Sequence, residues 1–157
     1  LDGIYLAGNG QLTDFHLDVD HAVPGCISRE NFKGIINGKG RAVFDGRILV
    51  RELAQKSSAH LSNANLMLSR QGEIDTKPQL EILADDVQCS HGTTVGQLNA
   101  EALYYLRSRG LSEIQARRML CLAFDDEIMQ RFDFDSLRQQ LTKTIRQQVE
   151  GSIGKAA

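Results

Sequence analysis

Residues 85–92 (DDVQCSHG) bring a thiol, an imidazole and two carboxylates into one short segment. Cys89 and His91 lie two positions apart, so on a β-strand they share one face. Thiolate and imidazole both bind transition metals, but zinc and iron–sulfur sites take about three or four ligands. The pair therefore predicts part of a metal site that another segment or another chain completes. The alternatives are a buried thiol beside a hydrogen-bonded histidine, or a cysteine nucleophile with a histidine base, for which no third orienting group is identifiable.

The remaining histidines and cysteines favour structural roles. His16 and His21 are five positions apart and would face opposite sides of one strand, and His60 stands alone on another. Cys26 follows a Pro-Gly pair, which indicates a packed thiol beside a turn. Cys121 lies between two leucines, which indicates the core of a helix.

A second candidate site is a surface for a protein partner, beside a glycine that separates two predicted helices. Tyrosine and arginine are enriched among the residues that dominate binding energy at interfaces, although a helix with one buried and one solvated face explains them equally. The residues are Tyr104, Tyr105, Arg107 and Arg109. The helix–glycine–helix outline also resembles a DNA-binding element, but acidic residues in its second helix cancel the basic bias that phosphate contacts require.

Composition limits the class of protein. The 157 residues carry 18 basic and 20 acidic side chains, a net charge of −2, and are 41% hydrophobic, which fits one globular domain with or without an appendage. No apolar run reaches the ~20 residues of a membrane span, and no basic field indicates a nucleic-acid partner. Three widely spaced cysteines form no disulfide framework and favour a reducing, cytoplasmic setting. Because the chain opens at Leu1 within an apolar segment, we expect a fragment of a longer protein.

The first 98 residues, rich in glycine, predict short strands punctuated by turns. The predicted strands are Ile4–Ala7, Leu12–Val19, Lys33–Ile36, Arg41–Phe44, Arg47–Leu53, Ala59–Leu68, Glu73–Asp75 and Leu80–Ala84. Asp45-Gly46 fits either a hairpin turn or the corner of a solenoid, and any tandem repeat is degenerate. The pattern alone therefore favours a β-sandwich and a β-solenoid equally.

The last 59 residues predict three helices. Asn99 can cap a helix over Ala100–Arg109 that ends before Gly110, and Ser112 opens a capping box for a second. Asp133 or Asp135 can cap a third, on which apolar residues recur every four positions. We expect this helix to end at Gly151 and residues 155–157 to be a frayed tail.

A family resemblance rests on several strings. Within residues 72–110, EIDTKPQLEILADDVQCSHGTTVGQL and then YYLRSRG are similar to the C-terminal region of the SufB/SufD family, which are scaffold proteins of iron–sulfur cluster assembly. The upstream KGRAVFDGRILV and NANLMLS fit the same family. The CSHG form resembles SufD, whereas the matching stretch of SufB reads like HEATT. SufB also has a cysteine near the position of Asn63, so the resemblance implies that this chain is not the primary scaffold.

The resemblance implies a right-handed parallel β-helix over residues 1–97 followed by a helical domain over 98–157. It implies pairing with a SufB-like subunit through the β-helix and with a SufC-like ABC ATPase through the helical domain. Cys89 and His91 would then line the SufB–SufD interface, where a transient cluster forms with ligands from the partner, and no cofactor would be bound stably by the chain alone. This is a non-enzymatic role, and the absence of a GxxxxGK[ST] motif from the sequence means that any ATPase acts in trans.

Two further expectations remain. An unpaired strand edge at Ile4–Ala7, together with a pairing surface left without SufB, predicts a homodimer of the isolated chain. The alternative function is a β-helical carbohydrate-active enzyme, which the adjacent Asp85 and Asp86 fit poorly because they would alternate faces. Gly92 is expected to let the backbone leave the strand just after His91.

Overall fold

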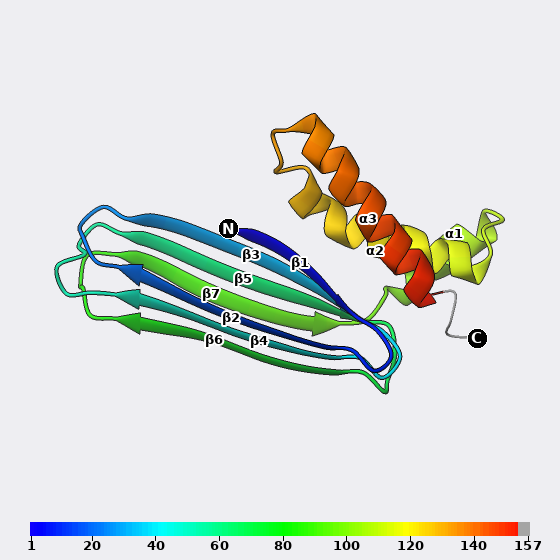
Figure 1. Cartoon of the computed structure of the whole chain (residues 1–157), viewed down its shortest axis with the longest axis horizontal. Coiled ribbons are helices and arrows are strands. Elements are labelled where there is room, and N and C mark those ends of the chain that lie inside the picture. Colours follow the sequence, from blue (N-terminus) through cyan, green and yellow to red (C-terminus); the bar gives the residue numbers. More distant parts are fainter. Residues whose placement is uncertain (154–157) are drawn as a thin grey trace.

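The computed structural model describes residues 1–153 as two stacked layers of strands with helices at one end (Figure 1). The strands are β1 (Asp2–Ala7), β2 (Leu12–His21), β3 (Ile27–Ile36), β4 (Arg41–Val50), β5 (Ser58–Met67), β6 (Glu73–Ile82) and β7 (Gln88–Gly96). The helices are α1 (Ala100–Ser108), α2 (Glu113–Met129) and α3 (Asp135–Ile153). Lys155-Ala156-Ala157, predicted to be a frayed tail, lies outside the described residues.

The chain winds as a parallel β-helix of about three turns. Sheet A has the order β1-β3-β5-β7 and sheet B the order β2-β4-β6, and every pairing is parallel. Ile27 lies beside Ser58 and Ser58 beside Gln88, so one turn of the β-helix takes about 30 residues. This arrangement confirms the solenoid that the family resemblance implied and excludes the sandwich.

Two predicted breaks in sheet B are wrong. Asp45-Gly46 lies inside the continuous strand β4, with no turn there, because the stacked neighbours in β2 and β6 hold the backbone extended. A Cβ at Gly46 would collide with the side chains of Leu61 and Phe44, so the close packing of the interior explains the glycine. Glu73–Asp75 and Leu80–Ala84 are likewise one strand, β6, and Pro78 is tolerated because β6 is an edge strand.

The interior between the sheets is apolar over most of its length. Phe32 lies between Phe15 and Phe44, with ring centroids 4.8 and 5.1 Å apart. Ile36, Ile48 and other inward side chains around this cluster are fully buried. Such aromatic contacts add roughly 0.5–1.5 kcal/mol each beyond the area that they bury, so this cluster anchors the two sheets to each other.

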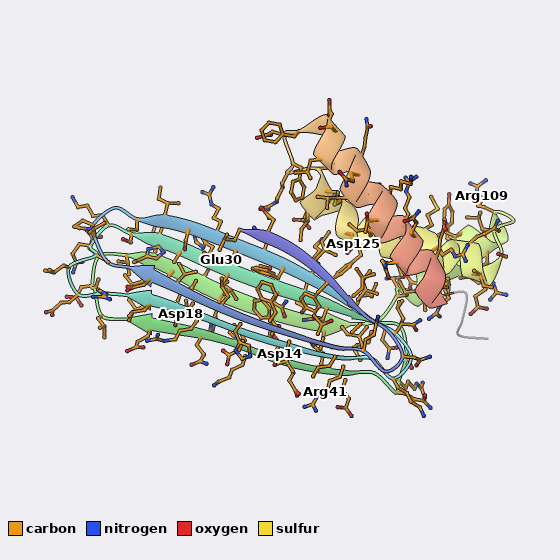
Figure 2. The ribbon with its side chains drawn as sticks, in the orientation of Figure 1. Asp14, Asp18, Glu30, Arg41, Arg109 and Asp125 are labelled. Carbon is orange, nitrogen blue, oxygen red and sulfur yellow. The ribbon has the colours of Figure 1, made fainter. Side chains whose placement is uncertain are left out.

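The outer face of sheet B carries several ion pairs between neighbouring strands (Figure 2). Arg47 on the central strand binds Asp18 of β2 at 3.2 Å and Glu81 of β6 at 2.7 Å. Arg41 pairs with Asp75 at 2.9 Å in the same way. These charges are exposed, so each pair adds at most a small stabilisation, and the face remains solvated.

The helices cover the outer face of sheet A near the carboxyl ends of its strands (Figure 1). A second apolar cluster joins Ile35 and Leu66 of the sheet to Cys121 of α2 and to Val149 and Ile153 of α3. Two cations reinforce this cluster. Lys33 Nζ donates to the main-chain oxygen of Phe124 at 2.6 Å and to Glu127 at 2.9 Å, and Arg117 donates to the main-chain oxygen of Leu68 at 2.9 Å.

α1 and α2 begin after their predicted caps, whereas α3 begins at Asp135, so Asp135 lies in its first turn and is not the cap that was predicted. The side chain of Asn99 accepts from Ala102 N, and Ser112 forms a capping box with Gln115. The predicted stop at Gly151 is wrong, because α3 continues to Ile153, whose burial in the second apolar cluster outweighs the weak helix propensity of glycine. Within residues 1–153, no helix is long and apolar enough to cross a membrane.

Candidate functional site

Both sheets end at the same end of the β-helix. β7 is the last strand of sheet A and β6 the last strand of sheet B, and in residues 1–153 no further strand pairs with either. Edge strands present unpaired N–H and C=O groups that can pair with another chain. We call this surface, formed by β6 and β7, the open end.

Cys89 and His91 lie on the inward face of β7 at the open end. Cys89 pairs in register with Ala59 and His91 with Leu61, and both partners are buried core residues of the preceding turn. Cys89 packs against the interior cluster and is half-buried, whereas His91 is exposed because no strand of sheet B faces it within the described chain. The structure therefore places the pair on one face of one strand, with the imidazole directed to where another chain could bind.

Two opposing effects act on the pKa of the Cys89 thiol. Burial raises its pKa, and a hydrogen bond with the backbone of Ala59 lowers it in part. A metal binds the thiolate, so metal binding must displace the thiol proton. The described residues contain no group of three or more His, Cys, Asp and Glu side chains arranged to hold a metal ion, and two ligands alone do not make a zinc or iron–sulfur site.

A buried polar network lies behind the open end, which the sequence reasoning missed. Asn63 is its centre, because its Oδ1 accepts from Asn65 at 2.7 Å and from Thr76 at 2.9 Å, and its Nδ2 donates to the Tyr5 hydroxyl at 3.0 Å. The Tyr5 hydroxyl donates to Asn65 Oδ1 at 2.5 Å. The signal was present in the sequence, since Asn63 and Asn65 occupy alternate, inward positions of a predicted strand.

The network reaches the strand that carries the candidate ligands. The Thr93 hydroxyl lies 3.1 Å from the main-chain oxygen of Asn63 and 3.0 Å from the Thr76 hydroxyl. Thr93 is two positions from His91 on the same face of β7. The network therefore joins β5, β6 and β7 beside the candidate metal ligands. Its close packing needs Gly34, where a Cβ would overlap the ring of Tyr5.

Two expectations about neighbouring residues need correction. Gly92 does not end the strand, because β7 continues to Gly96. The φ angle of Gly92 is not positive, so the backbone here has no unusual torsion. A Cβ at Gly92 would meet open space, which fits its position at an edge. Asp85 and Asp86 are exposed in the turn between β6 and β7, where a strand's alternation of faces does not apply.

The other histidines and cysteines are placed elsewhere. His16 is exposed beside Asp14 at 2.8 Å, and His21, on the same strand, is buried against Ser28, so the prediction of opposite faces is confirmed. His60 lies on the outer face of sheet A between Ser58 and Ser90. Cys26 lies in a turn, and Cys121 is fully buried in α2, as expected.

The predicted partner surface lies on α1, which follows β7 in the chain and lies beyond the ends of the strands (Figure 1). Tyr104 and Tyr105 are 76% and 57% exposed, so their aromatic area is available for binding. Arg109 lies over the Tyr105 ring at 5.4 Å, and Arg107 faces Glu113 at 3.7 Å. A shallow hollow of about 620 Å³ adjoins Tyr104 and Arg107 at the turn between α1 and α2.

The fold and the open end define a class of protein that sequence comparison identifies. Residues 1–124 match the family model described as "SUF system FeS cluster assembly, SufBD core domain". This match extends through all seven strands and α1 into α2. The chain belongs to the SufB/SufD family.

Individual relatives place the chain on the SufD-like side of this family. It is 39% identical over 151 residues to the iron–sulfur cluster assembly protein SufD of Escherichia coli, which covers 96% of this chain and 36% of that protein. It is 41% identical over 140 residues to a SufBD family protein of Synechocystis, covering 89% of this chain and 31% of the relative. The chain therefore spans about a third of the length of these relatives.

Proposed function

We propose that the chain is part of a SufD-like, non-enzymatic subunit of an iron–sulfur cluster assembly scaffold. The observation that carries this proposal is the position of Cys89 and His91, which share the inward face of an edge strand in a SufB/SufD-family β-helix. Relatives of the chain bear names that describe iron–sulfur cluster assembly, and SufD is among them. The cluster is the cargo of such a subunit and not its resident cofactor.

The partner at the open end is a SufB-like subunit. Its edge strands would pair with β6 and β7, and its side chains would supply the ligands that the described part of this chain lacks. Sharing ligands between two subunits keeps either one from holding a cluster alone, which suits a site that must release its product. The raised pKa of Cys89 acts in the same direction, because the thiol becomes a strong ligand only when metal displaces its proton.

In the absence of a SufB-like partner, a second copy of the chain would cover the open end. A second copy would bury the exposed inward face of β7 and would pair with the free backbone groups at the edges of β6 and β7. This homodimer uses the open end and not the edge at Ile4–Ala7, although β1 is, as expected, the other edge strand of sheet A in the described residues. Light scattering at about 100 μM should give the mass of a dimer, and a strictly monomeric mass contradicts this part of the proposal.

The partner at the helical end is a SufC-like ATPase. The exposed tyrosines of α1 and the hollow at the α1–α2 turn offer the aromatic and cationic groups that dominate many interfaces. α2 also packs on sheet A through Lys33 and Arg117, so a force applied to the helices passes directly to the β-helix. This connection gives ATP-driven movement of the partner a mechanical route to the open end.

The experiment that tests the proposal is co-purification with the SufB-like and SufC-like subunits. His91→Ala should leave assembly and melting temperature nearly unchanged, because an exposed side chain outside the core shifts stability by under ~0.5 kcal/mol. Iron bound to the complex isolated from cells should fall to near the background level. Normal iron loading in the His91→Ala complex removes this residue from the site, and lost assembly makes it structural instead.

The matched control is His16→Ala. His16 is an exposed histidine on β2 with a carboxylate neighbour, so the substitution changes the same side chain away from the open end. Iron loading should be normal in this variant. On α1, Tyr104→Ala combined with Arg107→Ala should weaken ATPase binding at least tenfold and leave binding of the SufB-like subunit intact. Deleting the helices is a poor test, because it would uncover the apolar residues Ile35 and Leu66 of sheet A.

A further inference from the structure

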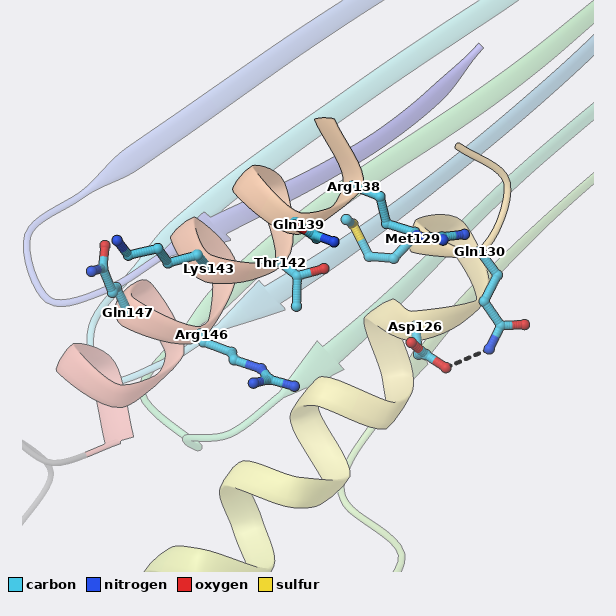
Figure 3. A pocket seen from close by; sticks show the side chains of 9 residues that line it. All are labelled: Asp126, Met129, Gln130, Arg138, Gln139, Thr142, Lys143, Arg146 and Gln147. Atoms are coloured by element: carbon cyan, nitrogen blue, oxygen red, sulfur yellow. Dashed lines mark hydrogen bonds between the residues drawn. The ribbon is translucent and has the colours of Figure 1, made fainter. Parts of the chain in front are cut away.

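The helical layer contains a hollow that the proposed function does not use (Figure 3). It has a volume of about 540 Å³ and lies between the C-terminal end of α2 and residues 138–147 of α3. Ligand sites of small molecules usually have volumes of about 300–1,000 Å³. The residues that line it are Asp126, Met129, Gln130, Arg138, Gln139, Thr142, Lys143, Arg146 and Gln147.

The charge of this hollow is positive in a protein with net charge −2. Its lining includes three cations, all from α3, and one carboxylate, Asp126, which accepts a hydrogen bond from Gln130. From Ser136 to Gln148 the sequence of α3 contains no acidic residue. The lining of the hollow is therefore rich in cationic side chains, whereas the outer face of sheet B carries many carboxylates.

Helical spacing places several polar groups of α3 on neighbouring turns. Lys143 and Arg146 are three positions apart, and Gln139 and Gln147 are each four positions from Lys143, so all four lie on neighbouring turns. Figure 3 shows Arg146 extending from α3 toward α2. In the same view the side chains of Lys143 and Gln147 extend to the other side of α3, so the lining offers guanidinium donors next to α2 and ammonium and amide donors at its edge.

The cations are not needed to hold the helices together. α3 packs through the apolar residues Ile145, Val149 and Ile153, which follow the same stripe of the helix as Arg138. Arg138 pairs with Asp135, but Lys143 and Arg146 form no ion pair with any side chain that the structure describes. By contrast, Lys33 and Arg117 are both used in the contact with sheet A. Like charges around one hollow repel, and a bound anion removes that cost.

We propose that this hollow binds a small phosphate-bearing molecule. Guanidinium matches phosphate with two parallel hydrogen bonds, and ammonium adds a point charge. Three cations, less Asp126 in the lining and Asp135 that pairs with Arg138, leave a charge of +1, which attracts the roughly −2 of a phosphate monoester near neutral pH. Met129 is the lining residue of α2 that carries neither a charge nor an amide, and it offers an adaptable apolar contact for an organic group on the phosphate.

The test is isothermal titration calorimetry of the purified chain with inorganic phosphate, pyrophosphate and phenyl phosphate at low ionic strength. We expect saturable binding with one site per chain that weakens at least tenfold in Lys143→Gln/Arg146→Gln. Tighter binding of phenyl phosphate than of inorganic phosphate assigns the site to an organic ester, and equal binding assigns it to the free anion. No binding of any probe overturns the proposal.

The control variant is Lys39→Gln/Lys77→Gln, which removes the same charge from exposed positions of the β-helix. Its affinity should remain within about twofold of the unmodified chain. An equal loss in this control shows attraction to net charge alone and overturns the site, as does full binding by Lys143→Gln/Arg146→Gln. Circular dichroism of each variant establishes that the helices are intact. Glutamine should preserve them, because its helix propensity is close to that of lysine and arginine.

Discussion

The hydroxyl of Thr93 lies 3.1 Å from the main-chain oxygen of Asn63, across the last pair of strands in sheet A. The same hydroxyl lies 3.0 Å from that of Thr76, which in turn donates to Asn63 Oδ1. Each hydroxyl has one proton, so these three contacts share two donors. The contact between Thr93 and Asn63 is a side-chain link from the edge strand β7 to the interior, in addition to the backbone ladder between β5 and β7.

Thr93→Val should loosen β7 while preserving its shape. The substitution removes the hydroxyl and leaves the acceptor Asn63 with one partner fewer, which costs about 1–2 kcal/mol. Hydrogen exchange of the β7 amides should accelerate, whereas exchange of the central strand β3 should follow only the global change in stability. Thr94→Val is the matched control, because the Thr94 side chain is exposed and points to the other face. Equal exchange in the two variants contradicts the role given to Thr93.

Asp125 should make the chain less stable as the pH rises. This carboxyl is buried in α2 without a hydrogen-bond partner among the described groups, and burial raises its pKa from 3.8 to about 7, partly offset by Lys33 (Figure 2). The folded chain therefore keeps a proton that the unfolded chain releases. Stability should be highest below about pH 4, should fall as the pH rises toward 7 and should then level off.

The substitution Asp125→Asn tests this dependence. It removes the titrating group, so the free energy of unfolding at pH 8 should rise relative to that of the unmodified chain by a few kcal/mol at most, at ~1.4 kcal/mol per pKa unit. The difference between the two chains should shrink toward pH 4. Urea unfolding at several pH values measures both slopes. Asp133→Asn, an exposed carboxylate near the start of α3, should leave the slope unchanged, and an unchanged slope in Asp125→Asn rules out this assignment.

Lys33→Met should weaken the attachment of the helices to the β-helix. Lys33 donates to a main-chain oxygen and a carboxylate of α2, and its ammonium lies 4.9 Å from the centre of the Phe124 ring. Methionine keeps most of the aliphatic contact but loses the charge, so we expect a loss of about 1–3 kcal/mol. Exchange of α2 amides should accelerate more than that of β4 amides. The control Lys77→Met removes an exposed lysine from sheet B and should change neither.

The three thiols should react with an alkylating reagent at very different rates. Cys121 is fully buried, and burial together with Asp125 raises its pKa to about 12, so at pH 8 it should react only on unfolding. Cys26 should react faster than Cys89, whose pKa is also raised by burial. Mass spectrometry after timed labelling measures each site. Binding of a SufB-like subunit should protect Cys89 and not Cys26, and labelling of Cys121 in the folded chain contradicts its placement.

The sequence predicted the division into strands and helices better than it predicted the register of the strands. In a parallel β-helix each residue stacks on another about 30 positions away, and local pattern does not report that distance. Asp45-Gly46 has a strong local preference for a turn, yet its stacked neighbours keep it extended. The helix caps at Asn99 and Ser112 were correct because capping depends on residues a few positions apart.

In the candidate site too, features that depend on nearby residues could be predicted and features that depend on distant residues could not. The alternation of a strand was sufficient to place Cys89 and His91 on one face, and residue type was sufficient to select Tyr104 and Tyr105 as an exposed pair. The inward positions of Asn63 and Asn65 could be read from strand alternation, but their contact with Tyr5 could not, because Tyr5 and Asn63 meet only after two turns of the chain. Asp125 was also missed, since a carboxylate on the buried side of a helix breaks the pattern by which such a side is recognised.

The open end also determines the symmetry of any complex that it forms. Two identical edges can meet only around a two-fold axis, so their strands run in opposite directions and one contact uses up both surfaces. Such pairing closes after two subunits, whereas stacking one end on a different end would repeat without limit and produce a fibre. A SufB-like partner with the same winding preserves this pseudo-symmetry while presenting different side chains. In the complex that we propose, a contact between two open ends would therefore join two subunits, and the identity of the side chains would select which pair forms.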